Sequence, residues 1–185
     1  MIFNQTEILT ALKDVKTLDG RIPVYQGANI RLEIVDPAYL EPTSKYVLQS
    51  SLERVNSTRE KIMGQKGIDI YKMPVGIFHE GFLIAPPVVE GNEIVDGLHR
   101  CHDSLHNGRQ IMVARITGIN ENLPSIGSSV SWDNVGVVKN KPLLGKDCRE
   151  LKTNIDDVSI NLRTLFRDLS LLGGTGRRPS YGQTT

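Results

Sequence analysis

The side chains best suited to chemistry in this chain stand together in the run Asp96-Gly97-Leu98-His99-Arg100. This run follows a short apolar segment, Glu93 to Val95, and opens a stretch to Asn107 with room for about three helical turns. A strand that turns through glycine into a helix brings backbone N–H groups and the positive end of the helix dipole to one point, which suits phosphate. His99 and Arg100 would lie in that first turn, where cations are unfavourable unless something negative is bound.

Asp96, at the end of the expected strand, could hold a divalent metal ion that neutralises the same phosphate. The plainer interpretation is that Asp96 only caps the helix, that Gly97 is there for the turn and that Arg100 lies on the surface. The residues alone leave both interpretations open.

Three histidines, His99, His102 and His106, follow one another at intervals of three and four. A helix would place His102 and His106 one above the other, a spacing similar to that of zinc ligands. The glutamate of the usual helical metal motif is absent, and the only further histidine is the distant His79. We therefore expect His99 to serve the phosphate site and the other two to be surface or packing residues.

The surroundings of the Asp-Gly-x-His-Arg motif resemble the ParB/sulfiredoxin superfamily over roughly residues 31–118. A short strand precedes the motif, the apolar segment Phe82 to Val89 comes before that strand, and the following helix ends at Gly108. Members of this superfamily bind ATP, ADP or CTP at the motif, and include a sulfinic acid reductase, free serine kinases, chromosome-partitioning CTP switches and ParB-like nucleases. The resemblance implies an α/β (α+β) fold, with a small mixed sheet, flanking helices and a strand-motif-helix phosphate site, plus a C-terminal helical extension.

The resemblance also implies roles for the residues of the motif. Asp96 would bind magnesium or orient the nucleotide, and the segment from Gly97 through Leu98 to Arg100 would bind phosphate. The Gly97 backbone would approach the phosphate, and His99 and Arg100 would contact its oxygens. The implied cofactors are ATP or ADP, with CTP as an alternative, and magnesium.

Departures from the family pattern exclude two kinds of member. Sulfiredoxin-like enzymes carry their catalytic cysteine directly before the motif histidine, where this chain has Leu98, and Cys101 falls at a position expected to face the core. Partitioning proteins continue into a helix-turn-helix domain, and the segment after Ile119 is too short and irregular for one. We expect neither sulfinic acid reduction nor a CTP-driven DNA clamp.

Serine-kinase-like members place a catalytic glutamate just after a proline that precedes a long helix. The corresponding segment here is Leu40-Glu41-Pro42-Thr43-Ser44, so Ser44 stands where the carboxylate belongs. Glu41 would substitute if the loop bends suitably, which makes Asp96, His99 and Glu41 the candidate catalytic residues.

The leading functional prediction is a nucleotide-binding phosphotransferase whose acceptor is an unknown small molecule or macromolecule. The first alternative is a ParB-like nuclease or nucleic-acid-binding protein, with Arg109, Arg177 and Arg178 extending the basic surface. The second is a catalytically inactive nucleotide sensor.

Length and composition fit one soluble domain with a small appendage. The 185 residues carry a formal net charge of +1, which gives no global argument for a nucleic-acid partner. Two cysteines without metal-type spacing favour a reducing compartment. We expect a cytoplasmic protein with no membrane partner, because the sequence shows no signal peptide and no stretch of about 20 apolar residues.

We expect three parts: an N-terminal helix and strand in residues 1–29, the nucleotide-binding domain in 30–119, and a C-terminal extension in 120–185. Hydrophobic spacing predicts a first helix from Thr6 to Gly20 and a long helix capped by Ser44 that continues through Met63 and ends at Gly64. The remaining predicted elements are strands at 22–25, 30–35 and 132–138, a hairpin of 73–78 with 82–89, and a helix at 158–172 before a flexible tail.

Overall fold

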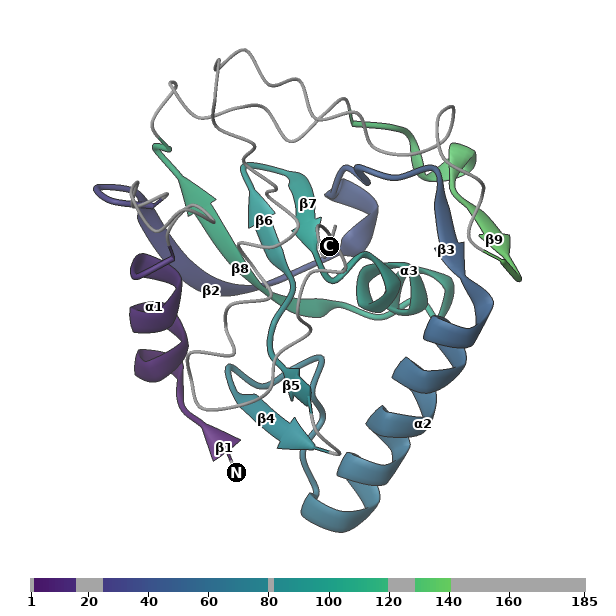
Figure 1. The fold of residues 1–185 in the computed structure, drawn as a ribbon, viewed down its shortest axis with the longest axis horizontal. Helices are drawn as coiled ribbons and strands as arrows, with labels where there is room; N and C mark the ends of the chain where they lie inside the picture. Colours follow the sequence, from purple (N-terminus) through teal and green to yellow (C-terminus); the bar gives the residue numbers. More distant parts are fainter. Residues whose placement is uncertain (1, 16–24, 80–81, 120–128, 141–185) are drawn as a thin grey trace, which may run out of the picture.

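The structure, a computed structural model, describes residues 2–15, 25–79, 82–119 and 129–140 (Figure 1). Its centre is a four-stranded mixed sheet in the spatial order β2 (Asn29–Val35), β8 (Ile111–Thr117), β6 (Val88–Glu90) and β7 (Glu93–Asp96). β2 and β8 are antiparallel, β8 and β6 are parallel, and β6 and β7 form an antiparallel pair joined through Gly91 and Asn92. The predicted α/β class is therefore observed.

Helices cover both faces of this sheet, with α1 (Gln5–Lys13) on one face and α3 (Leu98–His106) on the other (Figure 1). Alternate residues of β8 separate the two layers, because successive side chains of a strand point to opposite faces. Ala114 and Ile116 join the core under α1, whereas Ile111 and Val113 join the core that includes Cys101 of α3. The sheet thereby fixes where α3 begins.

Two smaller sheets complete the described part of the chain. β4 (Gly76–His79) and β5 (Phe82–Ile84) are antiparallel, which confirms a hairpin here but a shorter one than the predicted 73–78 with 82–89, and β1 (Ile2–Phe3) pairs with β4. The apolar segment that continues beyond β5 is split by Pro86 and Pro87, so its end, β6, joins the central sheet instead. β3 (Tyr46–Leu48) pairs in parallel with β9 (Gly136–Val138).

The prediction for the long helix is wrong at its start and its end. α2 (Gln49–Lys66) begins only after β3, and the left-handed Gly67, with a φ of 65°, ends it. Residues 46–48 are drawn into a strand by β9, a partner some 90 residues later that local spacing cannot reveal. Ser44 is not a cap, and Met63 is 44% exposed while its neighbour Ile62 is buried.

Other boundaries also differ. Asn4, in a capping box with Glu7, begins α1 two residues before the predicted Thr6 cap. The strand predicted from Trp132 is shorter, because residues Trp132–Asn134 form a 3-10 turn before β9. A further 3-10 turn spans Pro37–Tyr39. The strand expected at 22–25 falls largely outside the described residues, as do the helix expected at 158–172 and the tail. None of the helices in the described part of the chain is long and apolar enough to cross a bilayer.

Candidate functional site

The Gly97 turn, which we define as Asp96 to Arg100, joins β7 to α3 at the end of the central sheet. Gly97 is the N-cap of α3 and has a φ of 86°, a conformation that L side chains rarely adopt. A Cβ atom there would lie 2.7 Å from Cβ of Pro87 and 2.8 Å from Nη2 of Arg100. Backbone conformation and lack of space therefore both require glycine at this position.

The start of α3 leaves backbone donors unpaired. The N–H groups of Arg100 and Cys101 donate to the Gly97 carbonyl over 2.9 and 3.0 Å. No side chain caps the helix, and the N–H groups of Gly97 and Leu98 have no hydrogen-bond partner among the described residues. Such donors at the positive end of a helix favour an anion.

Arg100 and Asp96 form an ion pair beside these donors. Nη2 of Arg100 lies 3.4 Å from Oδ2 of Asp96, and Nη1 of Arg100 donates to the carbonyl of Ala85. The Arg100 side chain is only 14% exposed, whereas that of Asp96 is 38% exposed. Arg100 therefore does not lie free on the surface, and Asp96 makes an ion pair instead of a cap.

His99 connects the starts of two helices. Its Nε2 accepts a hydrogen bond of 3.0 Å from the backbone N–H of Leu48, the N-cap residue of α2. An accepting ring nitrogen carries no proton, so the imidazole is neutral in this arrangement. A neutral ring suits a position beside two positive helix ends better than an imidazolium would.

Glu41 lies at the other end of β7 from Asp96. Its backbone pairs with that strand. The N–H of Glu41 donates to the backbone carbonyl of Asn92 over 2.8 Å, and the N–H of Ile94 donates to the backbone carbonyl of Glu41 over 2.8 Å. This pairing places Glu41 beside Glu93, about 10 Å from Asp96 at the usual rise of a strand. The structure therefore brings Asp96, His99 and Arg100 to one turn but does not bring Glu41 beside them.

Ser44 occupies the position where the serine-kinase-like pattern has a carboxylate. It is buried, and its hydroxyl donates to the carbonyl of Tyr46 over 3.3 Å. Thr43, next to it, donates to the carbonyl of Ile94 over 2.5 Å. The Thr43 hydroxyl therefore fixes the segment to β7, and the Ser44 hydroxyl makes a local contact with the first residue of β3.

A buried polar network holds α3 in place, and the sequence did not reveal it. The Tyr71 hydroxyl donates to Oδ2 of Asp103 over 2.6 Å, and Asn107 donates to the other oxygen of Asp103 over 3.0 Å. Arg59 lies 4.9 Å from the centre of the Tyr71 ring and pairs with Asp69 at 3.1 Å. Burial raises the pKa of Tyr71, and the hydrogen bond to Asp103 raises it further.

The feature of the sequence that hints at this network is Asp103, a charged residue directly after Cys101 and His102. All three side chains are buried in α3.

Cys101 and His102 are both buried in α3. Burial raises the pKa of the Cys101 thiol to about 12, which makes it a packing residue and not a nucleophile. His102 stacks on His106 with 4.0 Å between ring centres and faces Trp132 at 6.2 Å. Among the described residues, no group of three His, Cys, Asp or Glu side chains could hold a metal ion.

Of the three arginines proposed to extend a basic surface, the structure describes only Arg109, and it does not lie at the turn. Arg109 is exposed beyond the C-terminal end of α3, so a helix of 9 residues, about 13 Å long, separates it from the turn. Arg177 and Arg178 lie outside the described residues.

Comparison with protein families identifies a match that covers most of the chain. The family model of the ParB CE domain matches residues 7–136, a span that begins in α1 and ends in β9 and includes the whole Gly97 turn. No curated protein and no solved structure matches the chain.

Proposed function

Because the chain belongs to the ParB CE domain family, we propose that it binds a nucleoside di- or triphosphate, ATP or ADP first, at the Gly97 turn. The observation that carries this proposal is the pair of N–H groups of Gly97 and Leu98 at the start of α3, which have no partner within the described ranges. Phosphate oxygens are natural acceptors for such groups. The superfamily resemblance of the Asp-Gly-x-His-Arg motif supports the same location.

Arg100 would assist by adding positive charge next to the amide donors. In the structure its charge is partly balanced by Asp96 at 3.4 Å and its Nη1 is held by Ala85. An incoming phosphate would compete with Asp96 for the guanidinium, since Arg binds phosphate oxygens strongly. His99 would contribute through its position beside Leu48 and not through a positive charge.

Magnesium fits this donor set as a companion of the nucleotide. Asp96 offers one partly exposed carboxylate, and Mg²⁺ is commonly held by one or two carboxylates together with phosphate oxygens and water. Bound there, the ion would neutralise phosphate charge. Asp96 is the residue that would hold it.

Phosphoryl transfer to an acceptor is the reaction we propose for the bound nucleotide. Such transfer depends mainly on positioning and charge neutralisation, which Gly97, Leu98 and Arg100 would supply. The general base is unassigned, because Glu41 is separated from Asp96 by the length of β7. Binding without transfer, as in a nucleotide sensor, is therefore the alternative within the same site.

The experiment is a thermal-stability panel of ATP, ADP, CTP and a short DNA, each with and without magnesium. A nucleotide at about 100 times its dissociation constant should add about 2.7 kcal/mol to stability. Asp96→Asn should remove the magnesium dependence, and Arg54→Gln, an exposed change on α2, should not. A shift with DNA alone, weakening steeply as salt rises, would replace nucleotide binding by the nucleic-acid alternative.

Transfer itself is measured with nucleotide labelled at the terminal phosphate. Release of labelled phosphate from the nucleotide, or transfer of the label to an acceptor, would support a phosphotransferase if the product is formed by the wild type and not by Asp96→Asn. Tight magnesium-dependent binding with no product over hours would support the sensor instead.

A further inference from the structure

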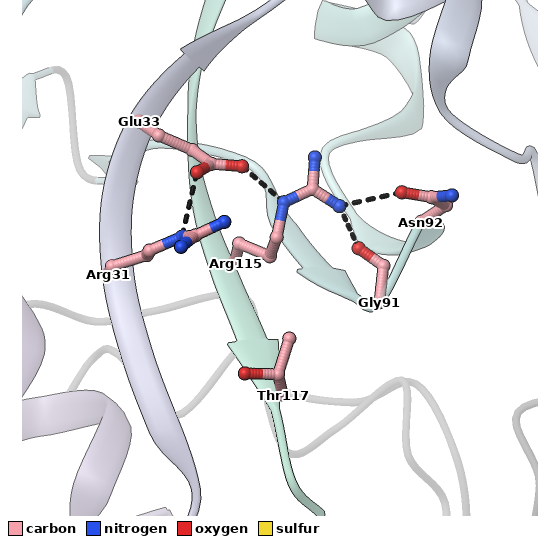
Figure 2. Close-up of a pocket in the computed structure, with 6 residues that line it drawn as sticks. All are labelled: Arg31, Glu33, Gly91, Asn92, Arg115 and Thr117. Atoms are coloured by element: carbon pink, nitrogen blue, oxygen red, sulfur yellow. Dashed lines mark hydrogen bonds and ion pairs between the residues drawn. The ribbon is translucent and has the colours of Figure 1, made fainter.

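A polar pocket of about 400 Å³ lies at the end of β7 opposite to the Gly97 turn. It is lined by Arg31 and Glu33 of β2, Arg115 and Thr117 of β8, and Gly91 and Asn92 between β6 and β7 (Figure 2). We call it the Arg31–Arg115 pocket. At the usual strand rise it is about 13 Å from the turn, so the two sites are separate.

The strand register explains why two arginines meet here. Arg31 and Arg115 are direct partners across the antiparallel pair of β2 and β8, an arrangement in which like charges repel. Glu33 lies two residues along the same face and bridges them: Oε2 is 2.8 Å from Nε of Arg31, and Oε1 pairs with Nε of Arg115. The three side chains together keep one positive charge.

The acceptors of the pocket are already used. Both oxygens of Glu33 are taken by the arginines, and Nη1 of Arg115 donates to the carbonyl of Gly91 and, over 2.8 Å, to Oδ1 of Asn92 (Figure 2). The side-chain groups without a partner among the described residues are Nη1 and Nη2 of Arg31, Nη2 of Arg115, Nδ2 of Asn92 and the hydroxyl of Thr117. The Thr117 hydroxyl can donate or accept a hydrogen bond, and the other groups can only donate.

The two arginines differ in how firmly they are held. The Arg115 side chain is 12% exposed and has three acceptors, whereas that of Arg31 is 59% exposed and has, among the residues that the structure describes, Glu33 as its one partner. One guanidinium is thus preorganised and the other can adjust to a ligand. This combination favours a ligand that enters from solvent.

We propose that the Arg31–Arg115 pocket binds a phosphate group, which Arg31, Arg115 and Thr117 hold by donated hydrogen bonds. A phosphate supplies acceptors only, matches guanidinium geometry and balances the remaining positive charge. The phosphate is either free or part of a nucleic-acid strand. This site does not depend on nucleotide binding at the Gly97 turn.

The test is an NMR titration of the ¹⁵N-labelled full chain with inorganic phosphate at constant ionic strength, following the Arg Nε–H signals. The signals of Arg31 and Arg115 should shift, and Arg31→Gln should weaken binding at least tenfold. Glu33→Gln should strengthen binding several-fold, because it removes the competing negative charge. Arg54→Gln is the matched control and should leave the affinity unchanged.

Unchanged phosphate affinity in Arg31→Gln would overturn the proposal, as would weaker binding in Glu33→Gln or equal shifts of all arginine signals. A short DNA strand in a parallel titration identifies the source: Arg31-dependent binding of the strand points to nucleic acid, and response to inorganic phosphate alone points to a free phosphate. Shifts of the Gly97 and Leu98 amides report the Gly97 turn separately, so failure of one site is distinguishable from failure of the other.

Discussion

Nε2 of His99 accepts a hydrogen bond of 3.0 Å from the backbone N–H of Leu48, and this contact ties the first turn of α3 to the N-cap residue of α2. Leu48 also ends β3, so one imidazole fixes a strand and two helix starts around the Gly97 turn. The phosphate contact that the superfamily resemblance implied for the His99 side chain stays a prediction. The ring nitrogen Nε2 is an acceptor within the protein, whereas the backbone N–H groups of Gly97 and Leu98 have no hydrogen-bond partner in the part of the chain that the structure describes.

His99→Leu should destabilise the protein by about 1–3 kcal/mol, because it leaves the partly buried Leu48 N–H without its acceptor. Urea unfolding of the two proteins measures the difference. Gln110→Leu, an exposed change after α3, is the control and should stay within about 0.5 kcal/mol of wild type. Equal stability of His99→Leu and wild type would contradict the contact.

Gly97→Ala should cost more than about 3 kcal/mol, because it adds a methyl group in a left-handed conformation against Pro87 and Arg100. Gly108→Ala is a matched control: its φ is 59°, but nothing lies within 4 Å of the added Cβ. That change should cost about 1 kcal/mol. Similar losses of stability in both variants would show that Pro87 and Arg100 do not crowd position 97.

Stability should fall at mildly acidic pH through His102. Burial lowers the pKa of His102 and the neighbouring His106 lowers it further, while Asp103 acts in the opposite direction. The unfolded chain, with a His pKa of about 6.5, therefore binds a proton before the folded one does. The stabilising contribution is complete above pH about 6.5 and is lost as the pH falls from there through the folded pKa.

Thermal unfolding at pH 7.5 and 5.5 measures this dependence. His102→Gln should reduce the difference between the midpoint temperatures of unfolding at the two pH values. An unchanged difference in the variant would assign the pH dependence to another group.

Cys101 should resist alkylation in the native protein at pH 8, because burial holds the thiol protonated with a pKa of about 12. Iodoacetamide in guanidinium chloride should label it fully. Peptide mass spectrometry reads Cys101 separately from Cys148. Rapid native labelling of the Cys101 peptide would mean that the core of α3 opens readily.

The sequence predicted best where the signal is local. The strand, turn and helix from Glu93 to His106 follow from an apolar run, a glycine and a helical stretch, and β2 follows from simple alternation. Gly108, expected to end the helix, has the left-handed φ of 59° that a helix end favours.

Non-local pairing accounts for what the sequence did not predict. β3 exists because β9 lies beside it, and Glu41 lies far from Asp96 because its segment pairs with Glu93 in parallel. Arg31 and Arg115 meet only through the register of β2 and β8. Helical spacing and motif order carry no information on such partners, so the Arg31–Arg115 pocket was missed.

Calorimetric titration of the full chain with ATP, ADP and CTP, each with and without magnesium, tests most directly whether the Gly97 turn binds nucleotide. We predict magnesium-dependent binding of at least one of the three nucleotides. Gly97→Ala, where that variant stays folded, should lose this binding. Asp96→Asn should still bind but without the dependence on magnesium. Arg54→Gln, an exposed change on α2, should bind as wild type does. No heat with any nucleotide, or binding that Asp96→Asn leaves unchanged in the presence of magnesium, would contradict a nucleotide site at this turn.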